Sequence, residues 1–381
     1  MDAYNKLKTL NAFQQQFHEP KELNEEIKSN YFKENKKTTW TFRTSEKVKY
    51  NVKDDHIEYI SNSNVHGLLY SELYQTLPEI KCKDGYKAHW IKNPMANIIK
   101  TASLYFDNTL LQSIDSDYLN VNSDSTDEEW LSYLPKRTYS IKLPWFYSNK
   151  NSSYFPFYKC GLNSNLIHKI EFKDIKDILL IGKVNKDEIT LVDFPEGIED
   201  INFKEVPQLW DEYLFLSPIE LKYNYCYNFN FNYIDIYKIS SKKKYTYNQE
   251  ISVPINISQP ICGLAWNVKN IEYNEDEISP IKESSLEYDN TFIFKDLPEF
   301  ITSKIHPTSG YNYWMLSDIN SSNPSSIVIP NGKLHIKLID KNEKDYFNVH
   351  LFCFILKKFI FDTNITSEED RINTKSKIHI E

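Results

Sequence analysis

Two histidines and one group of carboxylates are the residues of this 381-residue chain whose types could bind a metal ion. His335 and His350 lie on strand-like runs, but neither has a histidine or a carboxylate two residues away on the same face. Six acidic residues lie close together without the glycine and the spacing of a calcium loop: Asp115, Asp117, Asp124, Asp127, Glu128 and Glu129. A cupin-type metal site is the alternative for the histidines, whereas a solvated loop face explains the acidic group better. We predict no metal-binding residue and no cofactor.

Nucleophilic chemistry also lacks its usual surroundings in this sequence. No Gly-x-Ser-x-Gly turn presents a serine beside a base, and no glycine-rich loop ending in Gly-Lys-Ser or Gly-Lys-Thr could hold a phosphate. The cysteines form no Cys-x-x-Cys pair, which argues against a zinc ribbon. We expect reduced, mostly buried thiols at Cys82, Cys160, Cys226, Cys262 and Cys353. We therefore predict no catalytic residue and a protein that is not an enzyme.

The charge balance argues against a surface dominated by nucleic-acid binding. The chain has 45 basic and 53 acidic residues, a net charge of −8. The basic run Lys242–Lys244 is short and is interpreted as a solvated loop. The N-terminus lacks the apolar stretch of a secretory signal, and the apolar run Val349–Phe361 is interrupted by charge and too short to span a bilayer. We predict no direct contact with nucleic acid.

The elements that must carry these residues are predicted to be short β-strands. The chain has 27 Tyr, 22 Phe and 7 Trp, residue types that favour half-buried strands, and only 8 Gly. Strand-like runs occur at residues 39–43, 47–52, 56–60, 98–106, 178–181, 188–192, 221–239, 291–294, 326–329, 333–338 and 346–360. Short helices are expected at Ser71–Leu77 and at Asp127–Leu134, where Ser125 and Glu128 have capping-box spacing.

This pattern predicts an all-β protein with a few short helices in its loops. A turn-rich boundary near Pro207–Pro218 divides the β-rich region into two parts, each of a size that suits an eight-stranded antiparallel jelly roll. We predict an N-terminal arm over residues 1–38, a first roll over 39–212, a second over 213–362, and a polar, mobile tail over 363–381. The arm is expected to contain a short helix around Leu7–Phe17.

The most distinctive segment is Ile141–Tyr158, an apolar strand ending in aromatic residues, a polar turn and a second aromatic run. Its motifs Leu143-Pro144-Trp145-Phe146 and Phe155-Pro156-Phe157 resemble those of the double jelly-roll major capsid proteins of the nucleocytoplasmic large DNA viruses. Five further segments resemble that family in the same order: 67–80, 98–115, 168–172, 259–268 and 323–326. The resemblance covers about residues 40–361, although the family's glycine pair is replaced here by Phe106-Asp107-Asn108.

The resemblance implies two tandem eight-stranded jelly rolls and a capsid subunit that forms pseudo-hexagonal homotrimeric capsomers of an icosahedral shell. It implies capsomer–capsomer contacts, minor capsid proteins and an underlying membrane as partners, location in the virion and assembly in the host cytoplasm. A minor capsid or assembly-scaffold protein of the same lineage is an alternative. A carbohydrate-binding β-sandwich protein is the alternative from another class, because a sandwich rich in Trp and Tyr could bind sugars by stacking, although the aromatic residues here alternate along strands as core residues do.

Overall fold

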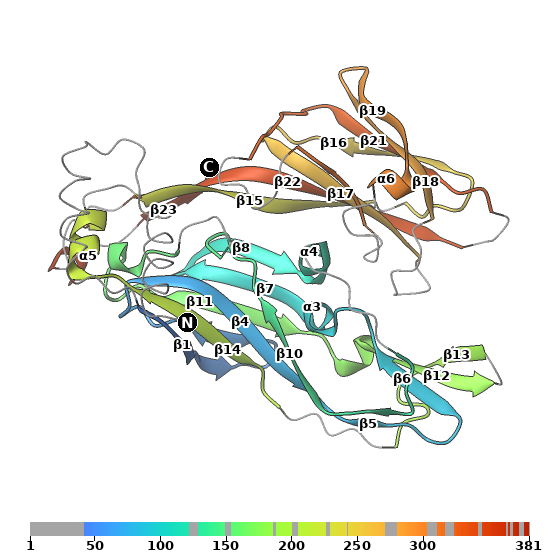
Figure 1. The fold of residues 1–381 in the computed structure, drawn as a ribbon, viewed down its shortest axis with the longest axis horizontal. Coiled ribbons are helices and arrows are strands. Elements are labelled where there is room, and N and C mark those ends of the chain that lie inside the picture. The colour runs from blue at the N-terminus through green and yellow to red at the C-terminus, as the bar shows by residue number, and fades with distance from the viewer. Residues whose placement is uncertain are drawn as a thin grey trace, which may run out of the picture.

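The computed structural model consists almost entirely of antiparallel strands arranged in two sandwiches (Figure 1). It describes residues 42–121, 129–148, 154–185, 188–199, 205–225, 229–241, 243–270, 280–302, 311–316, 324–341, 345–362, 365, 369–372 and 377–380. The predicted all-β double jelly roll is confirmed. The predicted N-terminal arm and its helix lie outside the described residues.

The first roll packs a four-stranded sheet against a five-stranded sheet. The four-stranded sheet has the order β1 (Phe42–Lys47), β14 (Gln208–Phe215), β4 (Gly67–Leu77) and β10 (Arg137–Lys142). The five-stranded sheet has the order β2 (Lys49–Val52), β3 (Ile57–Ile60), β11 (Leu166–Phe172), β7 (Ile99–Phe106) and β8 (Thr109–Asp115). Only Val48 separates β1 from β2, so one stretch of chain passes from one sheet to the other and closes that corner of the sandwich.

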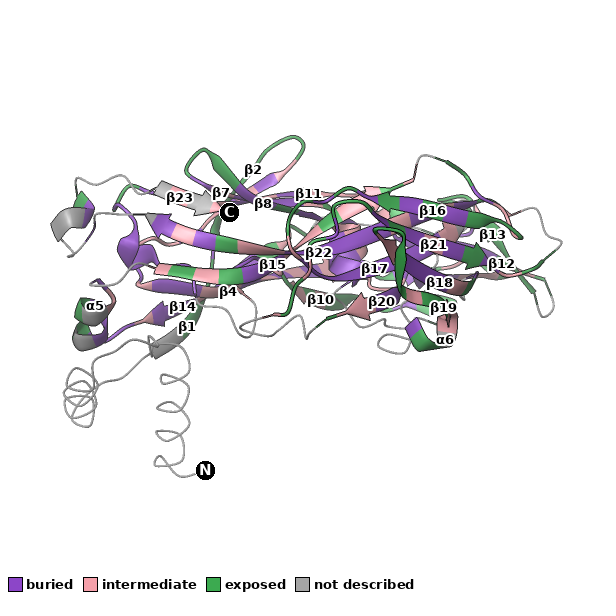
Figure 2. Ribbon diagram, turned by 90° about the horizontal axis from the view of Figure 1, so that it is seen from above, coloured by how far each residue is buried: buried purple, intermediate pink, exposed green. Residues whose placement is uncertain are grey.

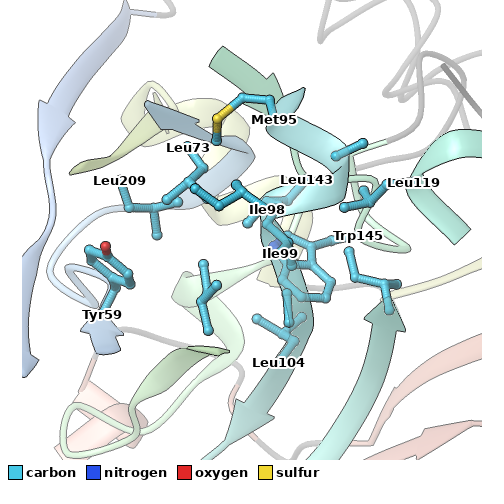
Figure 3. Close-up of a cluster of buried hydrophobic side chains, with 14 of the residues drawn as sticks. Tyr59, Leu73, Met95, Ile98, Ile99, Leu104, Leu119, Leu143, Trp145 and Leu209 are labelled. Carbon is cyan, nitrogen blue, oxygen red and sulfur yellow. The ribbon is translucent and has the colours of Figure 1, made fainter. Parts of the chain in front are cut away.

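Alternation along the strands explains the core of the first roll. Along β4, Ser71, Leu73, Gln75 and Leu77 are buried, whereas the residues between them are partly exposed, because successive side chains of a strand point to opposite faces. Figure 3 shows the inward side chains of several strands, among them Leu73, Leu104 and Leu209, meeting Trp145 of the loop after β10 in one cluster. Burial of such side chains contributes roughly 1.5–3 kcal/mol each before conformational entropy is subtracted.

The second roll has the same plan. One sheet has the order β15 (Phe229–Ser240), β22 (Phe347–Asp362), β17 (Ile261–Asn270) and β20 (Asn312–Met315), and β23 (Lys377–Ile380) also pairs with β22. The opposite sheet has the order β16 (Glu250–Ile255), β21 (Gly332–Leu338), β18 (Ile281–Tyr288) and β19 (Thr291–Pro298). Figure 2 shows purple, buried segments along β17, β21 and β22, where the two sheets enclose a second core.

Smaller elements decorate the two rolls. A side sheet joins β6 (Tyr86–Trp90), β12 (Leu179–Asn185) and β13 (Glu188–Val192), and β5 (Ile80–Lys81) pairs with β9 (Tyr133–Leu134). The described helices are all short: α3 (Pro94–Ile98), α4 (Ser116–Val121), α5 (Pro218–Tyr225), α6 (Glu299–Thr302), and the 3₁₀ turns η1 (Phe157–Lys159), η2 (Ile175–Asp177) and η3 (Glu369–Ile372). None of the helices in the described part of the chain has the length and apolar character needed to span a bilayer.

Both predicted helices are wrong where the structure describes them. Ser71–Leu77 forms the second half of β4, because its buried positions alternate with a period of two rather than following one helical face. The predicted helix Asp127–Leu134 lies outside the described residues up to residue 128. Its remainder is extended and ends in β9, where Leu131 bridges to Ala88 and Tyr133 pairs with Lys81.

Residues 221–239 do not form one strand, as predicted, because a helix occupies their beginning. Ser217 starts α5: its backbone N–H donates to a carboxylate oxygen of Glu220 at 2.9 Å, and the Glu220 N–H donates to the Ser217 hydroxyl at 3.2 Å. This reciprocal capping box, with Pro218 as the first helical residue, favours helix strongly. The strand β15 begins only at Phe229.

The segment Ile141–Tyr158 departs from the predicted strand in its middle. The strand β10 ends at Lys142, and the chain then turns inward. Trp145, Phe146 and Tyr147 are consecutive and all at most 1 % exposed, which a strand with one solvent-facing side could not achieve. The loop Leu143–Tyr147 therefore contributes its side chains to the hydrophobic core.

The C-terminal segment is ordered at several points rather than being a mobile tail. The strand β23 pairs with residues 359–362 of β22. Ile365 is fully buried, and the buried Arg371 donates hydrogen bonds to the carbonyls of Cys160 (3.0 Å) and Ser63 (3.2 Å). The predicted boundary between residues 212 and 213 falls within β14, at a register shift, and β14 pairs with β4 of the first roll on both sides of that shift. We place the division between the two rolls after Phe215 as a proposal.

Candidate functional site

The described residues contain one constellation with the residue types of a catalytic triad. The Ser61 hydroxyl donates to an Asp211 carboxylate oxygen at 2.6 Å and lies 3.0 Å from His168 Nε2. Ser71 donates to the other carboxylate oxygen of Asp211 at 2.6 Å, and Tyr213 donates to the first at 3.0 Å. These residues come from the loop after β3 and from β4, β11 and β14, strands of both sheets of the first roll.

The order of hydrogen bonds is not that of a triad. In a hydrolytic triad the carboxylate orients the histidine, whereas here Asp211 bonds to the serine, and His168 Nδ1 has no partner among the described residues. His168 and Asp211 have no exposed surface, so no substrate reaches them. Burial lowers the pKa of His168 to about 3 and raises the pKa of Asp211 to about 6, although three hydroxyl donors oppose the latter shift. This cluster is a buried polar network that ties the two sheets together.

The histidines considered for metal binding lie apart and have other partners. His335 Nε2 lies 2.8 Å from a carboxylate oxygen of Glu287 on the neighbouring strand β18, a cross-strand contact that sequence spacing could not reveal. His350 Nδ1 lies 3.0 Å from the Ser240 hydroxyl, and burial lowers the pKa of His350 to about 4. Across the described ranges, no three His, Cys, Asp or Glu side chains are grouped so that they could hold a metal ion.

The acidic group is partly neutralised by lysines of the other roll. Asp117 pairs with Lys238 of β15 and lies 3.7 Å from Lys269 of β17, and Asp115 lies 3.8 Å from Lys238. Burial opposes ionisation of Asp117, but the two lysines outweigh it and hold the pKa of this carboxyl below its usual value. Glu129 is exposed, and Asp124, Asp127 and Glu128 lie outside the described residues.

The remaining residues singled out in the sequence do not form a reactive site. Lys243 and Lys244 are exposed, and Lys242 lies outside the described residues. Cys160, Cys262 and Cys353 are buried free thiols, Cys82 is half-buried, and Cys226 is not among the described residues. Burial raises the pKa of Cys262 to about 11 and that of Cys353 to about 12, so both stay protonated and unreactive at neutral pH.

The largest feature that joins distant parts of the chain is an aromatic seam between the two rolls. Phe146 lies on the first-roll side, and its ring centroid is 4.7 Å from Phe359, 5.3 Å from Tyr233 and 6.0 Å from Phe231, all on strands of the second roll. Phe361 extends the seam with centroid distances of 6.2 Å to both Phe106 and Phe155. Tyr233, Phe359 and Phe361 thereby belong to the same continuous core as the first roll.

Hydrogen bonds also join the two rolls along this seam. Gln112 of β8 accepts a hydrogen bond from the Phe146 backbone N–H at 2.9 Å and donates to Asp235 of β15 at 3.3 Å. Lys357 of β22 donates to the same carboxylate at 2.6 Å. At the other end of the seam, the Tyr313 hydroxyl donates to the Val121 carbonyl at 3.0 Å. Figure 1 shows β8 and β7 beneath β15 and β22, so the two rolls form one block along their length.

Comparison with known proteins gives similarity in fold without similarity in sequence. No family model matches the chain, and no curated protein matches it. A chain of the PBCV-1 virus capsid is 10% identical over 85% of this chain and 95% of its own, with a TM-score of 0.61. The Faustovirus major capsid protein is 5% identical over 84% of this chain and 90% of its own, with a TM-score of 0.62. The mavirus major capsid protein is 10% identical over 88% of this chain and 93% of its own, with a TM-score of 0.52.

These similarities define the class of fold as that of the double jelly-roll viral capsid proteins. The resemblance inferred from the ordered motifs is therefore confirmed at the level of the fold. Sequence reasoning anticipated that Trp145, Phe146 and Phe155 matter for architecture, but it did not find their partners. Phe359 and Tyr233 lie over 80 residues away, and their alternation within β22 and β15 was their only local signal.

Proposed function

We propose that this protein is a capsid subunit that forms homotrimeric, pseudo-hexagonal capsomers of an icosahedral shell. The observation that carries the proposal is the continuous aromatic core that joins the two rolls into one block. The fold is also shared over most of its length with viral capsid proteins. Two rolls per subunit give a trimer six similar rolls around its axis, an outline that tiles a hexagonal lattice. The role is structural rather than enzymatic.

The buried groups support a structural role. The thiols of Cys160, Cys262 and Cys353 are buried and protonated, and the Ser61–His168–Asp211 network is inaccessible. The expected partners are other copies of the chain, minor capsid proteins and a membrane beneath the shell, and the expected location is the virion after assembly in the host cytoplasm. A cyclic trimer closes through heterologous contacts, and obligate interfaces of this kind bury roughly 2,000–5,000 Å².

Size-exclusion chromatography with light scattering of the purified full chain tests the proposal. We expect a trimer that persists on dilution to low micromolar concentration, and a hexagonal outline in electron micrographs of the particles. A stable monomer at that concentration would count decisively against the capsomer. Immunolabelling of mature virions separates the shell subunit from an assembly scaffold, because a scaffold is absent from finished particles.

A further inference from the structure

We propose that a groove on the outer face of the first roll binds neutral carbohydrate, with Trp210 and Tyr74 as the stacking platform. The groove has a volume of about 490 Å³, within the roughly 300–1,000 Å³ typical of ligand sites. It is lined by Tyr74, Thr76, Thr138, Glu205, Val206, Gln208 and Trp210. This site is separate from the seam and goes beyond the proposed capsid role.

Strand alternation places these side chains together. Leu73, Leu209 and Asp211 point into the core, so their neighbours on β4 and β14 point outward. Gln208 is directly opposite Tyr74 in the register, which makes Trp210 the diagonal neighbour of Tyr74 on the same face.

Two aromatic side chains are diagonal neighbours on this outward face. Trp210 is 36% exposed and Tyr74 is partly exposed. The outer face of β4 and β14 therefore combines two aromatic rings with one ion pair, Lys136 with Glu205, at a single groove.

The polar groups of the groove suit sugar hydroxyls. No described residue forms a side-chain hydrogen bond with Gln208 or with the indole N–H of Trp210, so the Gln208 amide and this N–H can serve a ligand. The hydroxyls of Thr76 and Thr138 lie 2.9 Å apart in the groove lining and supply further acceptors. A pyranose ring presents C–H groups on its faces and hydroxyls on its rim, which matches an aromatic wall with a polar surround.

The charge of the groove favours a neutral ligand. Glu205 is the one carboxylate of the lining, and it pairs with Lys136. Hydrogen bonds from Lys136 and Thr76 lower the pKa of Glu205, so the carboxylate is ionised but compensated. A sialylated or sulfated glycan would meet this carboxylate, whereas a neutral hexose meets no uncompensated charge.

Saturation-transfer NMR and calorimetry on the full chain with methyl pyranosides of glucose, galactose and mannose test the proposal. Multivalent neutral and sialylated glycans on an array provide the charge comparison. We expect Trp210→Ala to weaken binding of the best neutral glycan at least tenfold and Gln208→Ala to weaken it less. Tyr237→Ala is the matched control, because Tyr237 is 54% exposed on β15 of the other roll, and we expect it to bind like the wild type.

Light scattering of the same samples keeps this inference distinguishable from the capsid proposal. Neutral glycan binding that depends on Trp210, with an unchanged oligomeric state, supports the inference whether or not the protein is a trimer. Absence of binding to every neutral glycan at millimolar concentration overturns it, as does equal binding by Trp210→Ala. Dissociation of the oligomer by Trp210→Ala also overturns it, because the groove would then be a contact between copies of the chain.

Discussion

Replacing Phe146 by alanine tests whether the aromatic seam makes the two rolls one cooperative unit. Phe146 is 1% exposed, and three rings of the second roll lie within 6.0 Å of its centroid. Its removal leaves a cavity between the rolls while every strand of both sheets keeps its hydrogen bonds. The perturbation therefore acts mainly on the contact between the rolls.

The magnitude has two parts. A buried Phe→Ala substitution costs about 3–5 kcal/mol in unfolding free energy. Each aromatic pair contributes roughly 0.5–1.5 kcal/mol beyond its buried area, so the three pairs with Phe231, Tyr233 and Phe359 amount to about 1.5–4.5 kcal/mol of coupling between the rolls. This is a large share of the 5–15 kcal/mol that typically stabilises a folded protein.

Differential scanning calorimetry and urea unfolding measure both parts. We expect Phe146→Ala to lower stability by the stated amount and to broaden or split the unfolding transition, because the rolls then unfold with less dependence on each other. Phe157→Ala is the matched control: Phe157 is also buried, but its ring contact is with Phe155 of the same roll, at 5.1 Å. This variant is expected to lose similar stability while the two rolls still unfold together.

A transition of Phe146→Ala as sharp as that of the wild type, with a loss below about 1 kcal/mol, would refute the reasoning. Splitting of the transition in Phe157→Ala but not in Phe146→Ala would refute it as well. Either result would mean that the polar contacts around Gln112 and Asp235, rather than the rings, couple the rolls.

Three further predictions concern buried groups, the C-terminal segment and a glycine. Because the pKa of Asp211 is about 6 in the folded protein and 3.8 when unfolded, its contribution to stability falls by ~2 kcal/mol as pH rises from 4 to 6. The stability advantage of the wild type over Asp211→Asn is therefore expected to shrink by about that amount across this window in urea melts, and a growing advantage would contradict the assignment. Arg371→Ala is expected to cost about 2–5 kcal/mol, because two carbonyls lose a charged donor, and to expose the segment after residue 362 to limited proteolysis; unchanged protease resistance would disprove this anchoring. Gly263→Ala is expected to cost about 1–3 kcal/mol, because a Cβ there would lie 2.7 Å from a backbone oxygen, with Gly182→Ala, which meets only side chains, as the comparison in thermal melts; equal tolerance of both would contradict the close-approach argument.

Local patterns in the sequence predict many of the strands of this fold. Alternation of apolar residues predicts β3, β7 and β21 close to their observed bounds, because each is paired on both sides and faces the core with one side; β13 is also predicted correctly, although it is an exposed edge strand. The same rule fails for Ser71–Leu77, where Leu, Glu and Gln favour helix locally but burial between two neighbouring strands decides for β. The C-terminal residues were misjudged for the opposite reason, since a polar composition does not reveal that Arg371 and Ile365 enter the core of a distant roll.

Composition and motif order are enough to identify an aromatic, glycine-poor β protein without a recognisable catalytic or metal motif, with the motifs of a double jelly roll in sequence. Packing of the sheets establishes which rings meet across the seam, encloses Asp211 together with His168, and brings Trp210 and Tyr74 to one outer groove. These contacts join residues that are far apart along the chain. Periodicity fixes the face on which a side chain lies, whereas the partner on the other side of that face comes from residues a hundred positions away and is fixed only when the sheets pack.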